Sequence, residues 1–244
     1  MPIITISNNI NKISEKTHKQ FIIIAARVHP GETNTSYILH GLIKFLLSTD
    51  KLANMLREKF IFKIIPMINP DGAILGNNRA SLLGKDMNRS YLEANQKMNP
   101  EIYHIRHLVQ NILREQHDRL FAFFDLHQHS SRKSIFMYAP YFPLHSRKYL
   151  KIRMLPKLLA ERSPMFRYYS CKFKFERQKE GCARLSLWKD FNLENSYTLE
   201  CSALGYLNEQ RETIPFTEES LQEFGVLFAH SLCEFNLIKE QDHA

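Results

Sequence analysis

The chain has 244 residues, of which 44% are hydrophobic and 24% are charged. This balance excludes a disordered chain, a collagen-like repeat and a low-complexity polymer, and the length suffices for the core of one large domain. The 33 Lys and Arg residues against 25 Asp and Glu give a net charge of +8. This charge indicates either a polyanionic partner, such as nucleic acid, an anionic membrane or an acidic polypeptide, or equally a generally cationic solvated surface.

No segment has the sequence of a membrane span or a signal peptide. Apolar runs stay well short of the roughly 18 residues that cross a bilayer. No basic flank precedes an apolar stretch at the N-terminus. Four cysteines (Cys171, Cys182, Cys201 and Cys233) form no CxxC pair, so we expect free thiols in a reducing compartment.

Strand and helix signals alternate from the N-terminus to residue 100. Phe21–Val28 is a continuous apolar run, typical of a strand buried on both faces, and the turn sequence HPGE (29–32) ends it. Asn34 or Thr35 is expected to cap the next helix. The loop 69–100 is longer than compact domains usually carry without a function. The elements expected here are strands at 3–6, 21–28 and 60–67 and helices at 37–47 and 51–58.

The same alternation continues to the C-terminus. Pro156 is expected to bend one helix, and Thr217 should be the N-cap of the last one. The elements expected here are strands at 120–126, 134–138, 171–176 (an edge strand) and 196–201, and helices at 100–118, 145–162 and 217–235. Strands that alternate with helices predict an α/β fold with a mixed, mostly parallel central sheet between helices. No repeat, linker or composition shift divides the chain, so residues 1–244 should form one domain.

Side chains that bind metals and move protons follow the buried strands, where ligands bind in such folds. A catalytic zinc takes three His, Asp or Glu ligands and keeps one position for water. His29 and Glu32 are three residues apart across a Pro-Gly turn, so both could face one ion, with His127 as a distant third ligand. By itself this pattern is weak. His29 could equally bond a backbone carbonyl from its loop, and His127 could cap the sheet.

Six motifs along the chain, taken in their order, resemble those of a known protein family. They are HPGE (29–32), NPDG (69–72), GNNR (76–79), GKDMNRSY (84–91), DLHQHS (125–130) and NSYTLE (195–200). Together they resemble the cytosolic carboxypeptidases, zinc metallocarboxypeptidases of the funnelin type, many of which trim glutamates from tubulin and other proteins. The resemblance extends from about residue 3 to the final helix, and it implies a zinc carboxypeptidase-like fold.

The resemblance implies a catalytic role for several residues. His29, Glu32 and His127 match the ligands of one Zn2+ per chain. Glu200 matches the catalytic glutamate, since a carboxylate beside a metal-activated water can take its proton. Arg79 matches the arginine that steadies the developing oxyanion. For Glu200 the alternative is a surface ion pair at a strand end, and for Arg79 a loop-stabilising hydrogen bond.

Other matches concern the substrate and the metal's surroundings. Asn88 and Arg89 match the pair that grips the substrate's terminal carboxylate, with loop-stabilising hydrogen bonds as the alternative. Asp86 matches an aspartate that orients the first zinc histidine, or caps its own loop. Arg184, in KEGCAR, is the residue we expect to bind a glutamate side chain, against the alternative of a solvated basic strand. His129 could be mistaken for a fourth ligand, because alternate strand residues share a face; the match favours His127.

The chain departs from the family pattern in three places. Gln128 stands where glycine is usual between the two histidines, and KEGCAR replaces a more usual threonine-glycine. Family members usually carry a β-rich domain before the catalytic one, whereas this sequence begins almost at once on a strand of the catalytic domain. We therefore expect either a fragment or mispredicted gene, or a divergent short form, and in either case an exposed apolar patch and poor solubility. A tyrosine near the substrate is common in related enzymes; Tyr168, Tyr169 and Tyr197 are the candidates.

The sequence therefore predicts a zinc metallocarboxypeptidase that removes C-terminal residues, glutamate above all, from acidic protein tails such as those of tubulin. The resemblance places it in the cytoplasm, with microtubules or cilia as its surroundings. Two alternatives stay open: a zinc deacylase of N-acyl amino acids, and an inactive tubulin-binding fragment. Neither a membrane nor a nucleic acid is an expected partner, since the basic residues are scattered and form no recognised motif. The oligomeric state is not indicated.

Overall fold

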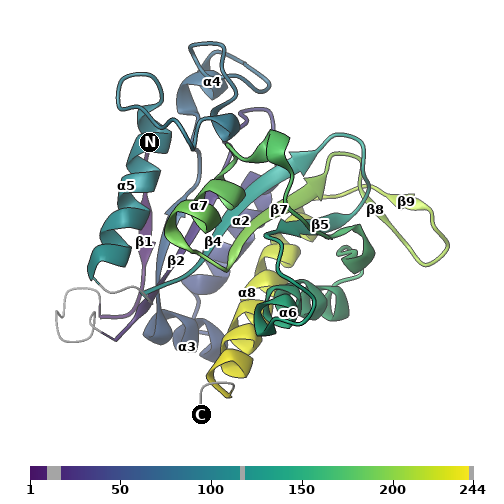
Figure 1. Ribbon diagram of the computed structural model, residues 1–244. Helices are drawn as coiled ribbons and strands as arrows, with labels where there is room; N and C mark the ends of the chain where they lie inside the picture. The colour runs from purple at the N-terminus through teal and green to yellow at the C-terminus, as the bar shows by residue number, and fades with distance from the viewer. Residues whose placement is uncertain (10–17, 116–118, 242–244) are drawn as a thin grey trace.

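The computed structural model describes residues 1–9, 18–115 and 119–241. Its strands alternate with helices along the chain, as Figure 1 shows. The strands are β1 (Ile4–Ile6), β2 (Gln20–Ala26), β3 (Phe60–Ile65), β4 (Leu120–His129), β5 (Ile135–Ala139), β6 (Lys172–Phe173), β7 (Ser196–Ser202), β8 (Tyr206–Leu207) and β9 (Thr213–Ile214). The helices are α2 (Asn34–Leu46), α3 (Lys51–Lys59), α4 (Pro70–Ile74), α5 (Pro100–Glu115), α6 (Arg147–Arg162), α7 (Ala183–Phe191) and α8 (Glu218–Gln241), with 3-10 turns η1 (Met87–Arg89), η3 (Tyr168–Ser170) and η4 (Arg177–Lys179).

The central sheet has seven strands in the order β1-β3-β2-β4-β7-β5-β6. Its middle strands, β3, β2, β4 and β7, run parallel to one another. β1 is antiparallel to β3, β5 is antiparallel to β7, and β6 pairs with β5 in parallel. The predicted mixed, mostly parallel sheet is confirmed.

Helices cover both faces of this sheet and bury an apolar core on each. One core is shared by α2, α3, α6 and α8, and the other by α5 and α7. In Figure 1, α5 and α7 lie in front of the sheet and α2 lies behind it. The long apolar strands are therefore buried on both sides, as the run Phe21–Val28 predicted. No helix in the described ranges combines the length and the apolar character that a membrane span requires.

Two glycines bring α2 and α8 into contact along their backbones. A Cβ on Gly225 would lie 2.1 Å from the carbonyl oxygen of Ile38, and one on Gly41 would lie 2.0 Å from that of Gln222. Only glycine fits where two helix backbones approach this closely. This packing fixes α2, which begins just after the HPGE turn.

The structure also corrects several expected boundaries. Neither Asn34 nor Thr35 caps α2: Thr33 occupies the N-cap, and the Asn34 side chain instead donates to the carbonyl of Ser202. β4 runs three residues beyond the predicted end, so His127 lies inside the strand. The predicted edge strand shrinks to β6, because its partner β5 stops before Pro140, which cannot donate a ladder hydrogen bond.

Other expected elements are confirmed or extended. Pro156 lies inside α6, and the Thr217 hydroxyl accepts from the backbone of Ser220 at the start of α8. α5 reaches Glu115, and residues 116–118 of the predicted helix lie outside the described residues. All four cysteines are free thiols.

Candidate metal centre and substrate pocket

The HPGE turn is held rigidly at the end of β2. Arg27 takes a left-handed φ of 55°, and its Nε donates to the carbonyl of Pro30 at 2.7 Å. Gly31 donates its backbone N–H to the carbonyl of Asn78 at 2.8 Å, and a Cβ there would lie 2.0 Å from the Asn78 side chain. The turn and the GNNR loop are thus in direct contact, and glycine is required at that contact.

The NPDG motif ties the same turn to the neighbouring strand. Asn69 donates its side-chain amide to the carbonyls of Val28 and Ala80 and accepts from the backbone of Gly72. Its own backbone N–H bonds the carbonyl of Arg27. Asn69 therefore positions the loops that carry His29 and Arg79.

Strand register brings the remaining catalytic candidates to the turn. β4 and β7 are parallel, and His127 lies directly opposite Glu200. Gln128, the departure from glycine, is used structurally: its side-chain oxygen accepts the backbone N–H of Asn34 at the start of α2. That N–H would otherwise lack an intrahelical partner. The backbone N–H of Gln128 in turn donates to Glu32 at 2.9 Å.

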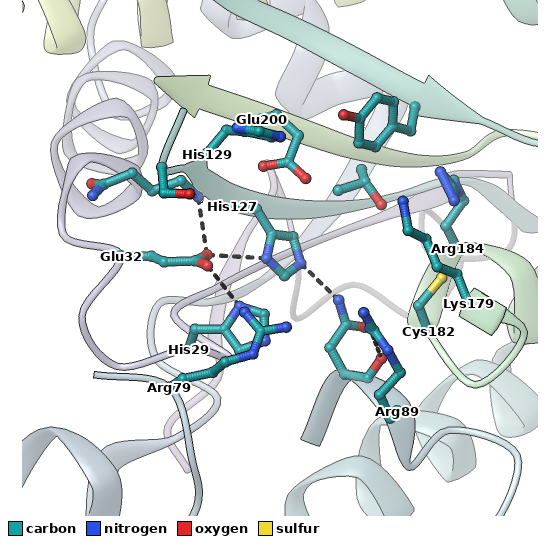
Figure 2. A pocket seen from close by; sticks show the side chains of 15 residues that line it. His29, Glu32, Arg79, Arg89, His127, His129, Lys179, Cys182, Arg184 and Glu200 are labelled. Atoms are coloured by element: carbon teal, nitrogen blue, oxygen red, sulfur yellow. Dashed lines mark hydrogen bonds and ion pairs between the residues drawn. The ribbon is translucent and has the colours of Figure 1, made fainter. Parts of the chain in front are cut away.

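His29, Glu32 and His127 form a cluster whose ligand atoms lie within 4.8 Å of one another. The Glu32 carboxylate lies between the two imidazoles, with Oε1 2.7 Å from Nδ1 of His29 and Oε2 3.0 Å from Nδ1 of His127 (Figure 2). Two imidazoles and one carboxylate are the donor set of a three-ligand catalytic zinc site. The three residues therefore fit the metal that the sequence predicted.

Each histidine has a carboxylate on its other ring nitrogen. Asp86 lies 3.0 Å from Nε2 of His29, and Asp125, which is fully buried, lies 2.7 Å from Nε2 of His127. Each of these carboxylates can accept an Nε2 proton, which leaves the Nδ1 atoms, once they lose their own protons, as the ligands that face a metal. Asp86 was assigned this position from the sequence, whereas Asp125 was missed.

Electrostatic coupling within the cluster is strong. Burial opposes the charge on Glu32, but His127 and His29 outweigh it and lower the pKa of this carboxyl to about 2. Burial also opposes the charge on each histidine, yet the carboxylates raise the pKa of His29 and raise that of His127 well above its usual range. Glu200 differs: burial raises its pKa, and the positive charge of His127 opposes that effect.

When bound, zinc would supply a Lewis acid that lowers the pKa of a coordinated water toward neutrality. Glu200 lies beside His127, and its raised pKa suits a group that takes a proton at neutral pH and returns it. Its carboxylate faces the open space above the cluster in Figure 2. The chain thus places a carboxylate beside three residues whose donor atoms fit a metal ion.

The 3-10 turn η1 carries the two residues expected to hold a terminal carboxylate. The Asn88 side-chain oxygen accepts from the backbone of Ala183 at 3.0 Å, and its nitrogen lies 3.1 Å from Nε2 of His127. Arg89 is exposed at the pocket and bonds the carbonyl of Asn88.

Arg79 lies next to the metal cluster, on the side of His29. It is half exposed, and its guanidinium bonds Asp86 at 2.6 and 3.1 Å. Because Asp86 also holds His29, one carboxylate positions both the predicted metal ligand and the predicted oxyanion-stabilising arginine. His29 and Arg79 line the same pocket.

The opposite wall of the pocket is basic. Arg184, in the first turn of α7, is 2% exposed, and its Nε has no hydrogen-bond partner within the described ranges. Its guanidinium lies 5.6 Å from the ring centre of Tyr138, and Lys179 lies 5.4 Å from the same ring. Figure 2 shows Arg184, Lys179 and Cys182 together on this wall. The sequence left open that Arg184 belongs to a solvated basic strand, and it did not predict α7, the helix that buries this residue.

Some expected candidates lie elsewhere. His129 lines the pocket but is outside the metal cluster, and its Nδ1 accepts the backbone N–H groups of Ser131 and Arg132. Tyr197 is fully buried against α6, and Tyr169 is almost fully exposed. Among the described residues that line the pocket, the tyrosine is Tyr138 on β5.

The chain is similar to known proteins over most of its length. A family model described as zinc carboxypeptidase matches residues 1–223. Cytosolic carboxypeptidase 2 of Xenopus tropicalis is 37% identical over 234 residues, which cover 96% of this chain and 24% of the relative. Cytosolic carboxypeptidase 2 of Homo sapiens is 36% identical over 96% of this chain and 26% of its own length. The chain therefore spans about a quarter of the length of these relatives.

Solved structures share the fold at lower identity. A metallo-carboxypeptidase from Burkholderia cenocepacia has a TM-score of 0.80 and 22% identity, covering 96% of this chain and 60% of that one. Thrombin activatable fibrinolysis inhibitor has a TM-score of 0.66 and 14% identity, covering 96% of this chain and 64% of that one. These likenesses establish a common fold.

Proposed function

The chain belongs to the zinc carboxypeptidase family, and from that premise we propose that residues 1–244 are a catalytic domain that removes C-terminal residues from proteins. We propose glutamate as the preferred residue and acidic tails as the substrate class. One zinc per chain is held by His29, Glu32 and His127, whose mutual distances support this role.

In this proposal the chain's own residues divide the work. Asn88 and Arg89 hold the terminal carboxylate, which restricts cleavage to the last peptide bond. Glu200 takes a proton from the attacking water and passes it to the leaving amine. Arg79 faces the oxygen on which negative charge develops. Asp86 and Asp125 keep the two metal histidines in position.

The proposed preference for glutamate rests on the position of Arg184. Its guanidinium is buried, lines the pocket and has no carboxylate partner in the part of the chain that the structure describes. A buried charge without a partner is unfavourable, and a substrate carboxylate relieves that penalty by pairing with it. A neutral C-terminal side chain leaves the penalty in place, so acidic residues are selected.

Tubulin tails are the protein substrate that we propose, as the resemblance implies. The net charge of +8 favours encounter with an acidic polymer. The curated relatives are named cytosolic carboxypeptidases, and we propose the cytosol, near microtubules or cilia, as the location.

Hydrolysis of short peptides tests the reaction class. Peptides that differ only in a C-terminal Glu or Gln are incubated with the zinc-loaded protein, with and without a chelator, and the released amino acid is quantified. N-acyl amino acids serve as parallel substrates. We expect single residues from the C-terminus, faster release of Glu than of Gln, and no release with the chelator.

Two outcomes would replace the proposal. Hydrolysis of N-acyl amino acids without peptide cleavage would identify a deacylase on the same scaffold. Zinc-loaded protein that binds acidic peptides but cleaves none would identify a binding fragment.

A further inference from the structure

Positive charge is concentrated in one stretch of the chain, which corrects the expectation that basic residues are scattered. Residues 132–189 contain 15 of the 33 Lys and Arg but 3 of the 25 Asp and Glu. This segment has a net charge of +12, and the rest of the chain has −4. It runs from the end of β4 to α7 and therefore borders the pocket.

Two of these cations, Arg132 and Lys172, contact residues that line the pocket or lie next to them. Lys172 lies 5.6 Å from the ring centre of Tyr138, which lines the pocket. Arg132 lies 5.7 Å from the ring centre of Phe136, whose ring centre is 5.5 Å from that of His129. The backbone N–H of Arg132 bonds His129, and its guanidinium bonds the carbonyl of Ser170 at 3.4 Å.

These two cations repel one another, and the carboxylate whose charge acts on Lys172 is Glu176. Burial lowers the pKa of Lys172, and the charge of Arg132 lowers it further. Glu176, the nearby carboxylate, pairs with Lys174 and Lys179 instead. Within the described ranges, no carboxylate forms an ion pair with Arg132 or Lys172. A bound anion would remove the repulsion between them.

The position of this pair follows from the direction of a bound substrate. If the last residue lies between Arg89 and Arg184, the scissile bond lies over the metal cluster beside Glu200. The chain upstream then leaves past the pocket residues on the other side, His129 and Ser130. Figure 2 shows His129 with the metal ligands and Glu200, away from the Arg184 wall. Both cations lie near His129: burial lowers the pKa of this imidazole, and the charges of Arg132 and Lys172 lower it further.

We propose that Arg132 and Lys172 form a second acidic subsite, which binds the carboxylate of the residue just before the scissile bond. The inference rests on the proposed function, because it takes the direction of the substrate from it. Its consequence is selection of consecutive acidic residues: Arg184 reads the last side chain and the Arg132–Lys172 pair reads the one before it. The substrate class is thus a run of acidic residues.

The test compares two peptides that both end in Glu and differ only in Glu or Gln at the preceding position. At low salt the parent should cleave the Glu-Glu peptide with a kcat/KM about 10-fold higher, the scale of a charge pair that is partly desolvated. In the double variant Arg132→Gln/Lys172→Gln this ratio should fall toward 1. Lys133→Gln, an exposed neighbour of Arg132, should keep the parent ratio.

A double variant that keeps the parent ratio overturns the subsite, and so does equal loss on both peptides. If the double variant fails to fold, the salt response of the parent decides. The ratio of kcat/KM between the two peptides should fall toward 1 in 0.5 M salt, because the Debye length is then only about 4 Å and exposed charge pairs are screened. A salt-independent ratio contradicts the proposal. Binding of both peptides to Glu200→Gln measures the subsite without hydrolysis, so its failure and that of the proposed function are distinguishable.

Discussion

Replacing Arg184 with methionine should stabilise the protein while removing its preference for glutamate. Methionine keeps the length of the buried side chain but removes a guanidinium that is 2% exposed and whose Nε is unpaired. Exchanging buried charge for an apolar side chain of similar volume is often stabilising by about 1–4 kcal/mol. Loss of the cation–π contact with Tyr138 offsets about 0.5–1 kcal/mol of this gain.

Subtracting the two ranges leaves a gain of about 0–3.5 kcal/mol, which corresponds to a rise in Tm of up to about 14 °C for a domain of this size. The functional effect has the opposite sign. Removing one partner of a buried charge pair costs about 2–5 kcal/mol, so kcat/KM for peptides ending in Glu should fall about 30- to 5000-fold. Peptides ending in Gln make no such pair, and the ratio between the two substrates should approach 1.

The assay combines thermal unfolding of the zinc-loaded protein with kcat/KM for peptides that end in Glu or Gln. Arg177→Met is the matched control, because Arg177 is exposed on η4; its Tm should change little and its preference should persist. A destabilised Arg184→Met that still prefers Glu would refute the reasoning, since Arg184 would then be a structural residue.

Three further predictions concern the metal and the core. Asp125→Asn removes the buried carboxylate at His127 and should weaken zinc binding about 10- to 100-fold in a chelator competition; an unchanged affinity would contradict that positioning role. Zinc binding should also strengthen with pH, by up to about 10-fold per pH unit for each proton displaced, because the pKa values of His29 and His127 are raised; a flat profile from pH 5.5 to 7.5 would count against it. In the zinc-free protein the stability of the fold should change with pH in the opposite direction. The raised pKa values of His29 and His127 stabilise the fold fully below the unfolded pKa of 6.5, and this stability is lost as the pH rises through the folded pKa. Gly225→Ala should destabilise by about 1–3 kcal/mol in urea unfolding, because its Cβ would meet the Ile38 carbonyl; a more stable variant would show that the two helices can separate.

The sequence predicts the parts of the site that local patterns determine. Long apolar runs identify the parallel strands, because those strands are buried on both faces. His29 and Glu32 are close in sequence, so their meeting at one ion requires little more than the turn. Asp125 could have been found as well, since it is two residues from His127 and shares its face of β4.

Other features depend on contacts between distant segments. Tyr138 reaches the pocket because β5 is antiparallel to β7, which sets it opposite Thr198. That register has no local signal in either strand. The short helix α7 has Arg184 buried in its first turn, where a charged residue argues against burial. The Arg132–Lys172 pair likewise joins the end of β4 to β6 at the sheet edge.

Release of glutamate from polyglutamylated tubulin tests the central claim most directly. The zinc-loaded protein is incubated with the tubulin, and free glutamate is quantified with a chelator and with Glu200→Gln as controls. The parent should release glutamate, and no glutamate should appear with the chelator or with the variant. Tails left intact by zinc-loaded protein, or a Glu200→Gln variant as active as the parent, would contradict it.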